Sequence, residues 1–518
     1  RTLPLVIEWS SARVPTPANG PPHAGRLSGM ARLTPGQRMG AGVAAAAVAV
    51  GVAQLLALFF PPAADVRTAV GTAVINLTPG PVKEWAIQTF GTADKLFLSV
   101  MVLVVIAALA ALSALWEPTQ KLGSVAIAAG AGAGCVAVLA RPGAGIFDII
   151  PTLVGAGCGL GVLRLLTSGR ITDGRADAES GPDPGRRLSL VTLGFAGLGL
   201  LSGVGGAVLI RRFRTVSGDR DTFALPTVKT PEPPVPAEVT PKGVALPSFI
   251  TSNADFYRID TALSVPQLAR DKWLLRIHGM VDREIVYRFA DLARFEPIQK
   301  TVTLTCVSNP VGGDLISNAV WTGYRVRDLL RDSGIHPDAD MVLSTSIDGF
   351  TAGTPVEALT DDRDSLLAIG MNGEPLPIEH GYPARLVVPG LYGFVSATKW
   401  VVDLELTRFD KTEAYWTKLG WSDRGPIKTE SRIDVPKDGQ KIGAGPVTFG
   451  GVAWAQNRGI KAVEVQIDDG PWQPAQLGAA YSKDTWRLWS FGWDATPGSH
   501  TITARATDAI EEIEHVAD

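Results

Sequence analysis

Cys306 is the only cysteine after Cys158, and it stands in the run KTVTLTCVSNPVGGDLISNAVWTGYRVRDLL. It ends a β-rich stretch and precedes a Gly-rich loop, and this half of the chain offers no second cysteine for a disulfide. Two interpretations remain: a small buried hydrophobic residue, or a thiolate that binds a metal or attacks a substrate. Cys135 and Cys158 lie in apolar segments, where we expect them to pack as small hydrophobic residues.

Three segments of the same half, one of them the end of the cysteine run, combine cationic and aromatic residues. They read SFITSNADFYRIDTALSVP, ISNAVWTGYRVRDLL and DSLLAIGMNGEPLPIEHGYPARLVVPGLYGFVSATKWVVDLEL. Cationic forks and backbone amides are the groups that bind a phosphate or another oxyanion. Taken singly, each residue also has an ordinary interpretation: His380 can cap a turn, Arg385 can form a surface ion pair, and Lys399 can pack against Trp400.

The segments lie in the first of two predicted soluble domains. Residues 248–425 alternate short β-like runs with helical pieces and show no regular βαβ repeat, which predicts an α+β domain. Residues 426–518 show short alternating strands with regularly spaced turn signals, typical of an immunoglobulin-like β-sandwich. The Pro-rich residues 215–247 are expected to form a stiff, extended spacer between these domains and a membrane anchor in the preceding part of the chain.

Residues 39–214 are dominated by Ala, Gly, Val and Leu, unlike the rest of the chain. A helix of about 20 apolar residues crosses the hydrocarbon core of a bilayer. We therefore predict an all-α anchor with five spans, at residues 39–60, 96–116, 122–140, 146–166 and 188–210. The weaker stretch 66–90 predicts a loop with an interfacial or re-entrant helix, and residues 1–38 predict a disordered cytoplasmic tail.

Arginines cluster before the first span and between the fourth and fifth spans. The positive-inside rule then predicts a multi-pass protein of the cell membrane, with the soluble domains on the extracytoplasmic side. Arg186 and Arg187, directly before the fifth apolar run, also resemble a twin-arginine export signal. The alternative is an ordinary positive flank.

Several function classes find no support. The six histidines all lie outside the predicted spans and there is no CxxCH motif, so we expect no haem, and the cysteines do not form an iron–sulfur set. There is no P-loop and no GxGxxG after a first strand, which disfavours nucleotide chemistry. A net charge of −3 with no basic stripe predicts no nucleic-acid partner.

Together and in this order, with a predicted β-sandwich behind them, the cysteine run and the three segments resemble the sulfite oxidase family of molybdopterin enzymes. The resemblance covers roughly residues 245–510, and MNGEPLP followed by HGYPARLVVPG is its most specific part. The five predicted spans resemble the membrane-anchored branch of that family. The resemblance implies a sulfite-oxidase-like catalytic domain at 248–425 and a dimerisation-like sandwich at 426–518, so a homodimer is expected.

In that family one cysteine thiolate ligates molybdenum, beside a single pterin. The resemblance puts Cys306 in that position, and makes Cys306 and Arg258, which faces the metal in relatives, the catalytic residues. A soft thiolate suits a transition metal. The implied cofactor contacts are Asn253, Phe256, Tyr257, Arg258, Asp348, His380, Arg385, Ser396, Ala397, Thr398 and Lys399.

The chain departs from the family pattern at two places. Sulfite oxidases proper follow the metal cysteine with a closely spaced arginine pair, where this chain reads Val307-Ser308-Asn309-Pro310-Val311. Relatives also place a tyrosine five residues after a tryptophan, where Trp416 is followed by Trp421. The resemblance therefore implies two-electron oxygen-atom transfer at molybdenum without fixing the substrate.

We predict oxygen-atom transfer on a small oxyanion or sulfur compound outside the membrane. Because no haem domain is expected, electrons would pass to or from a separate partner, such as a cytochrome c or a membrane redox protein. One alternative is a sulfoxide or protein methionine-sulfoxide reductase with the same cofactor. The other is a non-enzymatic membrane assembly module.

Overall fold

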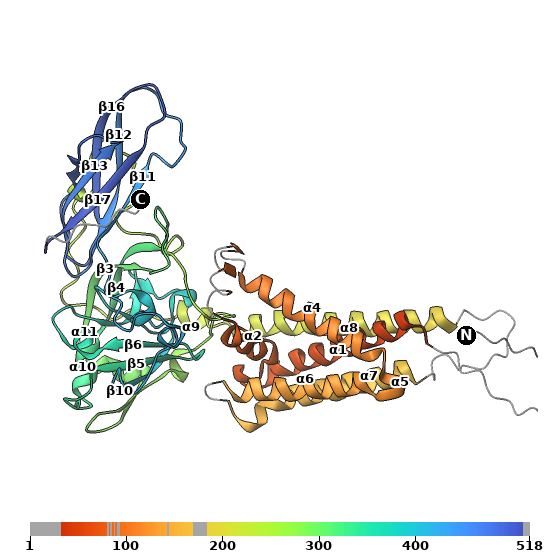
Figure 1. Cartoon of the computed structure of the whole chain (residues 1–518). Coiled ribbons are helices and arrows are strands. Elements are labelled where there is room, and N and C mark those ends of the chain that lie inside the picture. Colours follow the sequence, from red (N-terminus) through yellow and green to blue (C-terminus); the bar gives the residue numbers. More distant parts are fainter. Residues whose placement is uncertain are drawn as a thin grey trace, which may run out of the picture.

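The computed structural model describes residues 33–79, 82, 85–86, 89–90, 94–141, 144–168 and 184–510. Within these residues a helical bundle occupies one side of the molecule, an α+β domain packs against one end of the bundle, and a β-sandwich lies beyond it (Figure 1). Most of the predicted N-terminal tail lies outside the described residues.

Five helices of the described part are long and apolar enough to cross a membrane: Pro35–Phe59, Lys95–Ala114, Leu122–Leu139, Ile146–Thr167 and Gly185–Asp221. The five predicted apolar helices are thus confirmed, with ends shifted by a few residues. The helices of the bundle are α1 (Pro35–Leu56), α2 (Val66–Leu77), α4 (Asp94–Ala114), α5 (Glu117–Gln120), α6 (Leu122–Leu139), α7 (Ile150–Thr167) and α8 (Pro184–Arg214). Within the weak stretch 66–90, α2 is too short to span a bilayer, and residues 80–81, 83–84 and 87–88 lie outside the described part.

Small residues allow the helices to approach one another closely. α1 contacts α4, α7 and α8. A Cβ at Gly155 or Gly159 of α7 would collide with the α1 backbone, and a Cβ at Gly199 of α8 would do the same. This close van der Waals packing helps to hold the helices of the bundle together.

The α+β domain holds two sheets. The first has the order β2-β1-β10-β5-β6, in which β1 and β10 are parallel, and the second has the order β3-β4-β7-β8, with β9 paired to β7. The core of buried aliphatic and aromatic residues lies between them, with α10 (Val326–Arg331) and α11 (Val356–Thr360) packed against it. The strands are β1 (Leu274–Gly279), β2 (Ile285–Arg288), β3 (Pro297–Thr305), β4 (Ile316–Arg325), β5 (Met341–Ser346), β6 (Thr351–Pro355), β7 (Leu366–Met371), β8 (Glu374–Pro375), β9 (Arg385–Val387) and β10 (Val401–Thr407).

The C-terminal domain is a sandwich of two antiparallel sheets, ordered β11-β12-β16-β15 and β14-β13-β17. Trp489 is fully buried between these sheets, whereas Trp454 and Trp486 fill the contact with the α+β domain. The strands are β11 (Glu430–Val435), β12 (Gly445–Trp454), β13 (Ile460–Ile467), β14 (Gln473–Pro474), β15 (Gln476–Leu477), β16 (Arg487–Ala495) and β17 (Ile502–Asp508).

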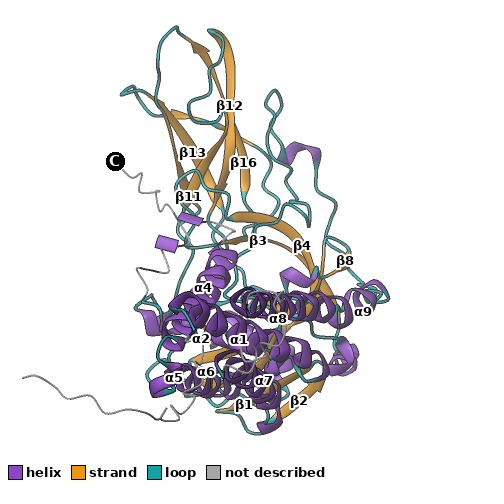
Figure 2. Ribbon diagram, turned by 90° about the vertical axis from the view of Figure 1, so that its right-hand side faces the viewer, coloured by secondary structure: helices purple, strands orange, loops and turns teal. Residues whose placement is uncertain are grey.

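The segment 215–247 differs from the predicted spacer. It begins with a short helix, α9 (Ser217–Asp221), and then lies along both soluble domains. Phe223 and Leu225 pack against the α+β core, and Glu232 accepts hydrogen bonds from Thr301 and Tyr481. The apolar residues between the prolines pack against the domain surface, so the segment connects the two soluble domains by its contacts with both. Seen along the bundle (Figure 2), the helices lie over the α+β domain and the sandwich projects beyond them.

Candidate active site

Cys306 directly follows β3, at the start of a loop with a defined shape. The Cys306 amide donates to the Leu315 carbonyl (2.9 Å), and the Asn309 amide donates to the Cys306 carbonyl (3.0 Å). The Asn309 side chain accepts from the Leu315 amide (2.9 Å), which closes the loop. These bonds hold the thiol at a fixed place on the end of the strand.

β3 itself is held by the sandwich. The buried Gln456 donates to the Thr303 carbonyl and to the Thr305 hydroxyl, both at 3.0 Å. The Trp486 amide donates to the Thr303 hydroxyl at 2.8 Å. Arg432 of β11 donates to the Gly313 carbonyl in the cysteine loop at 2.7 Å. The sandwich therefore positions the strand and loop that carry the thiol.

The thiol of Cys306 is partly buried and free of any disulfide. Burial raises its pKa, while hydrogen bonds with Ser308 act in the opposite direction. A thiol of this kind becomes a thiolate when a metal binds it and displaces the proton.

A second group of residues forms around His380 and Arg385. His380, at 4% exposure, lies against the Phe256 ring with centroids 5.4 Å apart. Arg385 opens β9 at 5% exposure, lies over the Trp321 ring at 5.1 Å, and donates to the His380 carbonyl at 3.1 Å. Gly381 between them has a φ of +114°, and a Cβ there would crowd Arg385 and Lys399, so only glycine fits.

Burial governs the charge state of this group. It lowers the pKa of Arg385 to about 10. Burial, reinforced by the charges of Arg385 and Lys399, lowers the pKa of His380 to about 3, so this histidine is neutral. No carboxylate pairs with Arg385 among the described residues. A buried cation without a carboxylate is costly unless an anion binds beside it.

Lys399 and Arg258 meet at Asp260. The Asp260 side chain is only 4% exposed, and its Oδ2 accepts from the Lys399 ammonium at 2.8 Å and from Arg258 Nε at 3.0 Å. Its Oδ1 accepts from the ammonium of Lys95, at the start of α4, at 2.5 Å. Burial raises the pKa of Asp260, but the charges of Lys399 and Lys95 outweigh it and hold that pKa below its usual range. Burial lowers the pKa of Lys399 to about 8, against the raising effect of Asp260.

The loop before β1 brings the predicted residues of the first segment to these groups. Asn253 accepts from the Asn372 amide nitrogen at 2.8 Å, and the Tyr257 amide donates to the Ser317 hydroxyl at 3.1 Å. Tyr257 stacks on Phe256 with centroids 5.4 Å apart. Burial raises the pKa of Tyr257, and the charge of Cys306 raises it further, whereas the charge of Arg385 lowers it. The thiol and the buried guanidinium therefore both act on this phenol.

The remaining predicted residues lie on neighbouring loops. Ser396 donates to the Tyr392 carbonyl at 2.9 Å, Thr398 bonds the Ser344 hydroxyl at 2.7 Å, and Ala397 lies between them. The Lys399 ammonium lies 4.7 Å from the Trp400 ring centre, so the ordinary interpretation of stem packing applies together with its ion pair. Asp348 lies in the turn between β5 and β6, where its side chain accepts from the Phe350 amide at 3.2 Å.

The structure thus gathers Phe256, Tyr257, Arg258, His380, Arg385 and Lys399 into one group beside Cys306. Sequence reasoning missed Asp260 and Lys95. Asp260 carried a signal, because it lies two residues after Arg258 in a segment that was already singled out. Lys95 carried none, because a lysine at the start of a span reads as a membrane flank.

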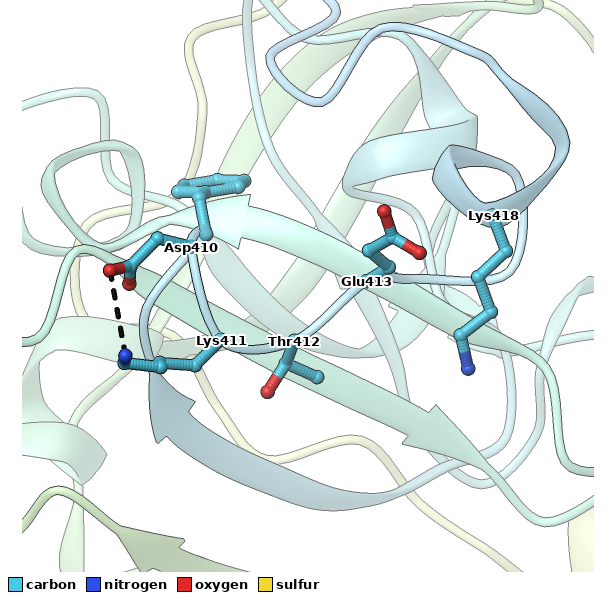
Figure 3. Close-up of a pocket in the computed structure, with 6 residues that line it drawn as sticks. Asp410, Lys411, Thr412, Glu413 and Lys418 are labelled. Atoms are coloured by element: carbon cyan, nitrogen blue, oxygen red, sulfur yellow. Dashed lines mark ion pairs between the residues drawn. The ribbon is translucent and has the colours of Figure 1, made fainter.

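Two surface hollows of the described residues lie away from these side chains. One, in the segment after β10, is lined by Phe409, Asp410, Lys411, Thr412, Glu413 and Lys418. Figure 3 shows these side chains and the ion pair between Asp410 and Lys411 (3.9 Å). None of the predicted site residues lines this hollow, so the candidate site is defined by its buried side chains.

Comparison with known proteins finds similarity over both soluble domains. The family model for the oxidoreductase molybdopterin binding domain matches residues 262–416, and the bacterial Ig domain model matches residues 430–504. An uncharacterized oxidoreductase of Bacillus subtilis, YuiH, is 33% identical over 154 residues, which cover 30% of this chain and 74% of that protein. Human mitochondrial sulfite oxidase is 28% identical over 311 residues, or 50% of this chain and 56% of the human protein.

This chain belongs to the sulfite oxidase family of molybdopterin oxidoreductases. Like the human protein, other sulfite oxidases are matched over only part of their length: 66% in Macaca fascicularis and 52% in Rattus norvegicus. Among solved structures, the sulfane dehydrogenase SoxCD from Paracoccus pantotrophus is 26% identical with a TM-score of 0.47, covering 52% of this chain and 75% of that one.

The residues present fit the cofactor that the sulfite oxidase family implies. Arg385 is a buried cation without a carboxylate, as a site for an anionic pterin phosphate requires. The described residues hold no group of three or more His, Cys, Asp or Glu that could bind a metal. A metal at Cys306 would therefore need ligands from outside the protein, which a pterin dithiolene provides.

Proposed function

We propose that this member of the sulfite oxidase family is a membrane-anchored molybdenum–pterin oxidoreductase that transfers an oxygen atom to or from a small oxyanion or sulfur compound. The observation that carries the proposal is the unpaired Cys306 thiol beside a group of buried cations, within the matched residues 262–416. When bound, the cofactor would supply two-electron oxygen-atom transfer. In the oxidising direction the substrate gains one oxygen from water, and two protons and two electrons are released.

Each predicted residue has a defined task in this proposal. Cys306 would hold the metal, and Arg258, whose side chain is 42% exposed, would face both the metal and solvent, where it can attract an anionic substrate. Arg385, His380 and Lys399 would hold the pterin phosphate, with neutral His380 donating one hydrogen bond. Asn253, Phe256, Tyr257, Asp348 and residues 396–398 would line the pterin.

The five apolar helices would anchor the protein in the cell membrane, with the catalytic domain on the extracytoplasmic side. The supporting observation is that the soluble domains lie at one end of the bundle (Figure 1). Arg186 and Arg187, in the first turns of α8, would then serve as a twin-arginine export signal. A cytochrome c or a membrane redox protein would exchange the electrons, and the sandwich would support a homodimer.

A reductase acting on sulfoxides, including methionine sulfoxide in proteins, is the second candidate. The loop after Cys306 favours it, because Val307 is 37% exposed, Val311 is 95% exposed, and no basic residue stands between them. An open, uncharged loop beside the thiol suits a bulky neutral substrate better than a small anion. The match to an oxidoreductase family leaves the non-enzymatic alternative without a supporting observation.

Elemental analysis of the full chain, expressed with ample molybdate, tests the cofactor. We expect molybdenum and pterin in equal amounts, both in the wild type and in the control Cys158→Ser. Cys158 lies in α7, outside the site. Cys306→Ser should lose turnover by at least about 100-fold, because even the outer partners of metal ligands are worth 10- to 100-fold. Full turnover by Cys306→Ser would refute the metal assignment.

A substrate screen in both directions tests the reaction. Sulfite with an artificial acceptor and a methionine-sulfoxide peptide with an artificial donor represent the two candidates. Turnover with sulfite alone would favour the oxidase, and turnover with the peptide alone would favour the reductase. A molybdenum-loaded protein with neither activity would refute both substrate classes.

A further inference from the structure

The helical bundle contacts the α+β domain on the side that carries the candidate site. Gly71 of α2 lies against Leu263. Asp219 lies in α9, which directly continues the fifth apolar helix of the bundle; it pairs with Arg270 at 2.9 Å and accepts from the Tyr382 hydroxyl at 2.6 Å, one residue from Gly381. The third contact, between Lys95 and Asp260, belongs to the cation group itself.

The geometry at Asp260 divides its two oxygens between the domains. Oδ1 accepts from Lys95 of the bundle, whereas Oδ2 accepts from Lys399 and Arg258 of the α+β domain. Arg258 uses only Nε for this contact. Arg258 therefore makes a single hydrogen bond to Asp260, not the bidentate pair that an arginine forms when both carboxylate oxygens are accessible.

This contact differs from an ordinary pair across the interface. Arg220 of α9 pairs with Glu374 at 2.9 Å, but the Glu374 side chain is 60% exposed, and exposed pairs contribute little. The Asp260 side chain is 4% exposed, so an oxygen left without a donor there would be costly. If Lys95 were absent, Arg258 or Lys399 would turn toward Oδ1 and bind Asp260 more tightly.

We propose that Lys95, supplied by the membrane bundle, is a positioning residue of the candidate anion site. By occupying Oδ1 of Asp260, it leaves Lys399 and Arg258 available to bind an oxyanion. It also adds a positive charge beside them. The inference rests on the proposed function for the identity of the oxyanion, which is either the phosphate of the cofactor or the anionic substrate.

The experiment compares Lys95→Met with the wild type, as the full chain in nanodiscs. Inorganic sulfate is the probe, because it is an oxyanion that does not turn over, and calorimetry gives its affinity. Molybdenum and pterin contents are measured on the same samples. We expect a loss of at least about threefold in Lys95→Met, because one nearby positive charge is removed.

The two sources of the oxyanion give different results. If Lys95 serves the cofactor phosphate, Lys95→Met lowers the molybdenum and pterin content. If it serves the substrate, the content is unchanged and sulfate affinity of the loaded protein falls. Wild-type protein without molybdenum would defeat the proposed function alone, because sulfate binding to the cofactor-free chain would still report on Lys95.

Controls separate positioning from simple attachment. Glu374→Gln removes the exposed interface pair and should change neither quantity, and Lys95→Arg should restore both. In an Asp260→Asn background, Lys95→Met should have a clearly smaller effect, because only the direct effect of the Lys95 charge remains there. Should Lys95→Met fail to fold, Lys95→Gln carries the same test. Equal behaviour of the neutral Lys95 variant and Glu374→Gln, or an undiminished effect in the Asp260→Asn background, would overturn the proposal.

Discussion

The two sides of the candidate site are built from different interactions. On the thiol side, Cys306 follows a strand that the sandwich holds by neutral hydrogen bonds, with Gln456 and Trp486 as donors, and Arg432 is the one charged donor named at the loop. On the cation side, Arg385 is buried without a carboxylate, and Lys399 shares Asp260 with Lys95 from the helical bundle. One side is therefore set by geometry and the other by charge.

The difference follows from what each side would have to do. A metal ligand must keep its position whatever the pH or salt, and neutral buried hydrogen bonds respond to neither. An anion site must hold positive charge out of water until the anion arrives, which costs stability in its absence. The cation side should therefore respond strongly to bound anions and to pH, and the thiol side should not.

Arg385→Met should give the largest effect on the cation side. Removing a buried charge without a carboxylate should stabilise the cofactor-free chain by about 1–3 kcal/mol. The same change should lower molybdenum and pterin content at least about tenfold, since it removes a charged donor from the proposed phosphate site. Thermal unfolding and elemental analysis measure these two opposite effects.

Arg325→Met is the matched control, because Arg325 already pairs with Asp364 at 2.9 Å and is partly exposed. It should leave the cofactor content unchanged. A cofactor-free Arg385→Met chain that is less stable than the wild type would show that Arg385 has a compensating partner, and the two sides would no longer differ in this respect.

His380 gives the cation side a pH dependence. Its pKa is about 3 in the folded chain and ordinarily 6.5, so between these pH values His380 is protonated in the unfolded chain and neutral in the folded chain. The stability that His380 contributes is present in full above about pH 6.5 and is lost as the pH falls from there toward 3. At pH 4.5 the loss is about 2–3 kcal/mol relative to pH 7.

Melting of cofactor-free wild type and His380→Gln at pH 7 and pH 4.5 measures this loss. The stability of the wild type relative to His380→Gln should be lower at pH 4.5 than at pH 7. Added phosphate should reduce the shift, because a bound anion offsets the charges of Arg385, Lys399 and Arg258 that keep His380 neutral. A constant gap at both pH values would contradict the buried neutral state.

The sequence predicted the elements well, because their signals are local. Apolar runs mark the five helices, and alternating strands mark the sandwich. Cys306, Arg258, His380, Arg385 and Lys399 were named from segments far apart in the chain, through a family resemblance rather than a physical pattern. The packing of residues 215–247 against the soluble domains was not predicted, because a Pro-rich composition does not indicate which surface the segment contacts.

The sharing of Asp260 could not be predicted, for a physical reason. The ion pair joins Lys95 and Asp260 across 165 positions, and neither residue has a local pattern that requires the other. The same holds for Gln456, which bonds β3 from 153 positions away. Long-range polar partners are fixed by the packing of domains, and a single sequence does not carry that information.

The thiol side should show the smallest and least variable effect. Gln456→Met keeps the volume of the side chain but removes the donor to the Thr303 carbonyl and the Thr305 hydroxyl. We expect a loss of about 1–3 kcal/mol, because buried acceptors are left without a partner. Thermal unfolding should give the same loss at pH 7 and pH 4.5, with or without phosphate.

Gln473→Met, at an exposed position of β14, is the matched control and should change stability by less than about 0.5 kcal/mol. Molybdenum retention in Gln456→Met should fall by a smaller factor than in Arg385→Met, because the loop of Cys306 keeps its own hydrogen bonds. A loss that grew at pH 4.5 or shrank with phosphate would mean that charge also acts through β3, and the two sides of the site would then be one coupled unit.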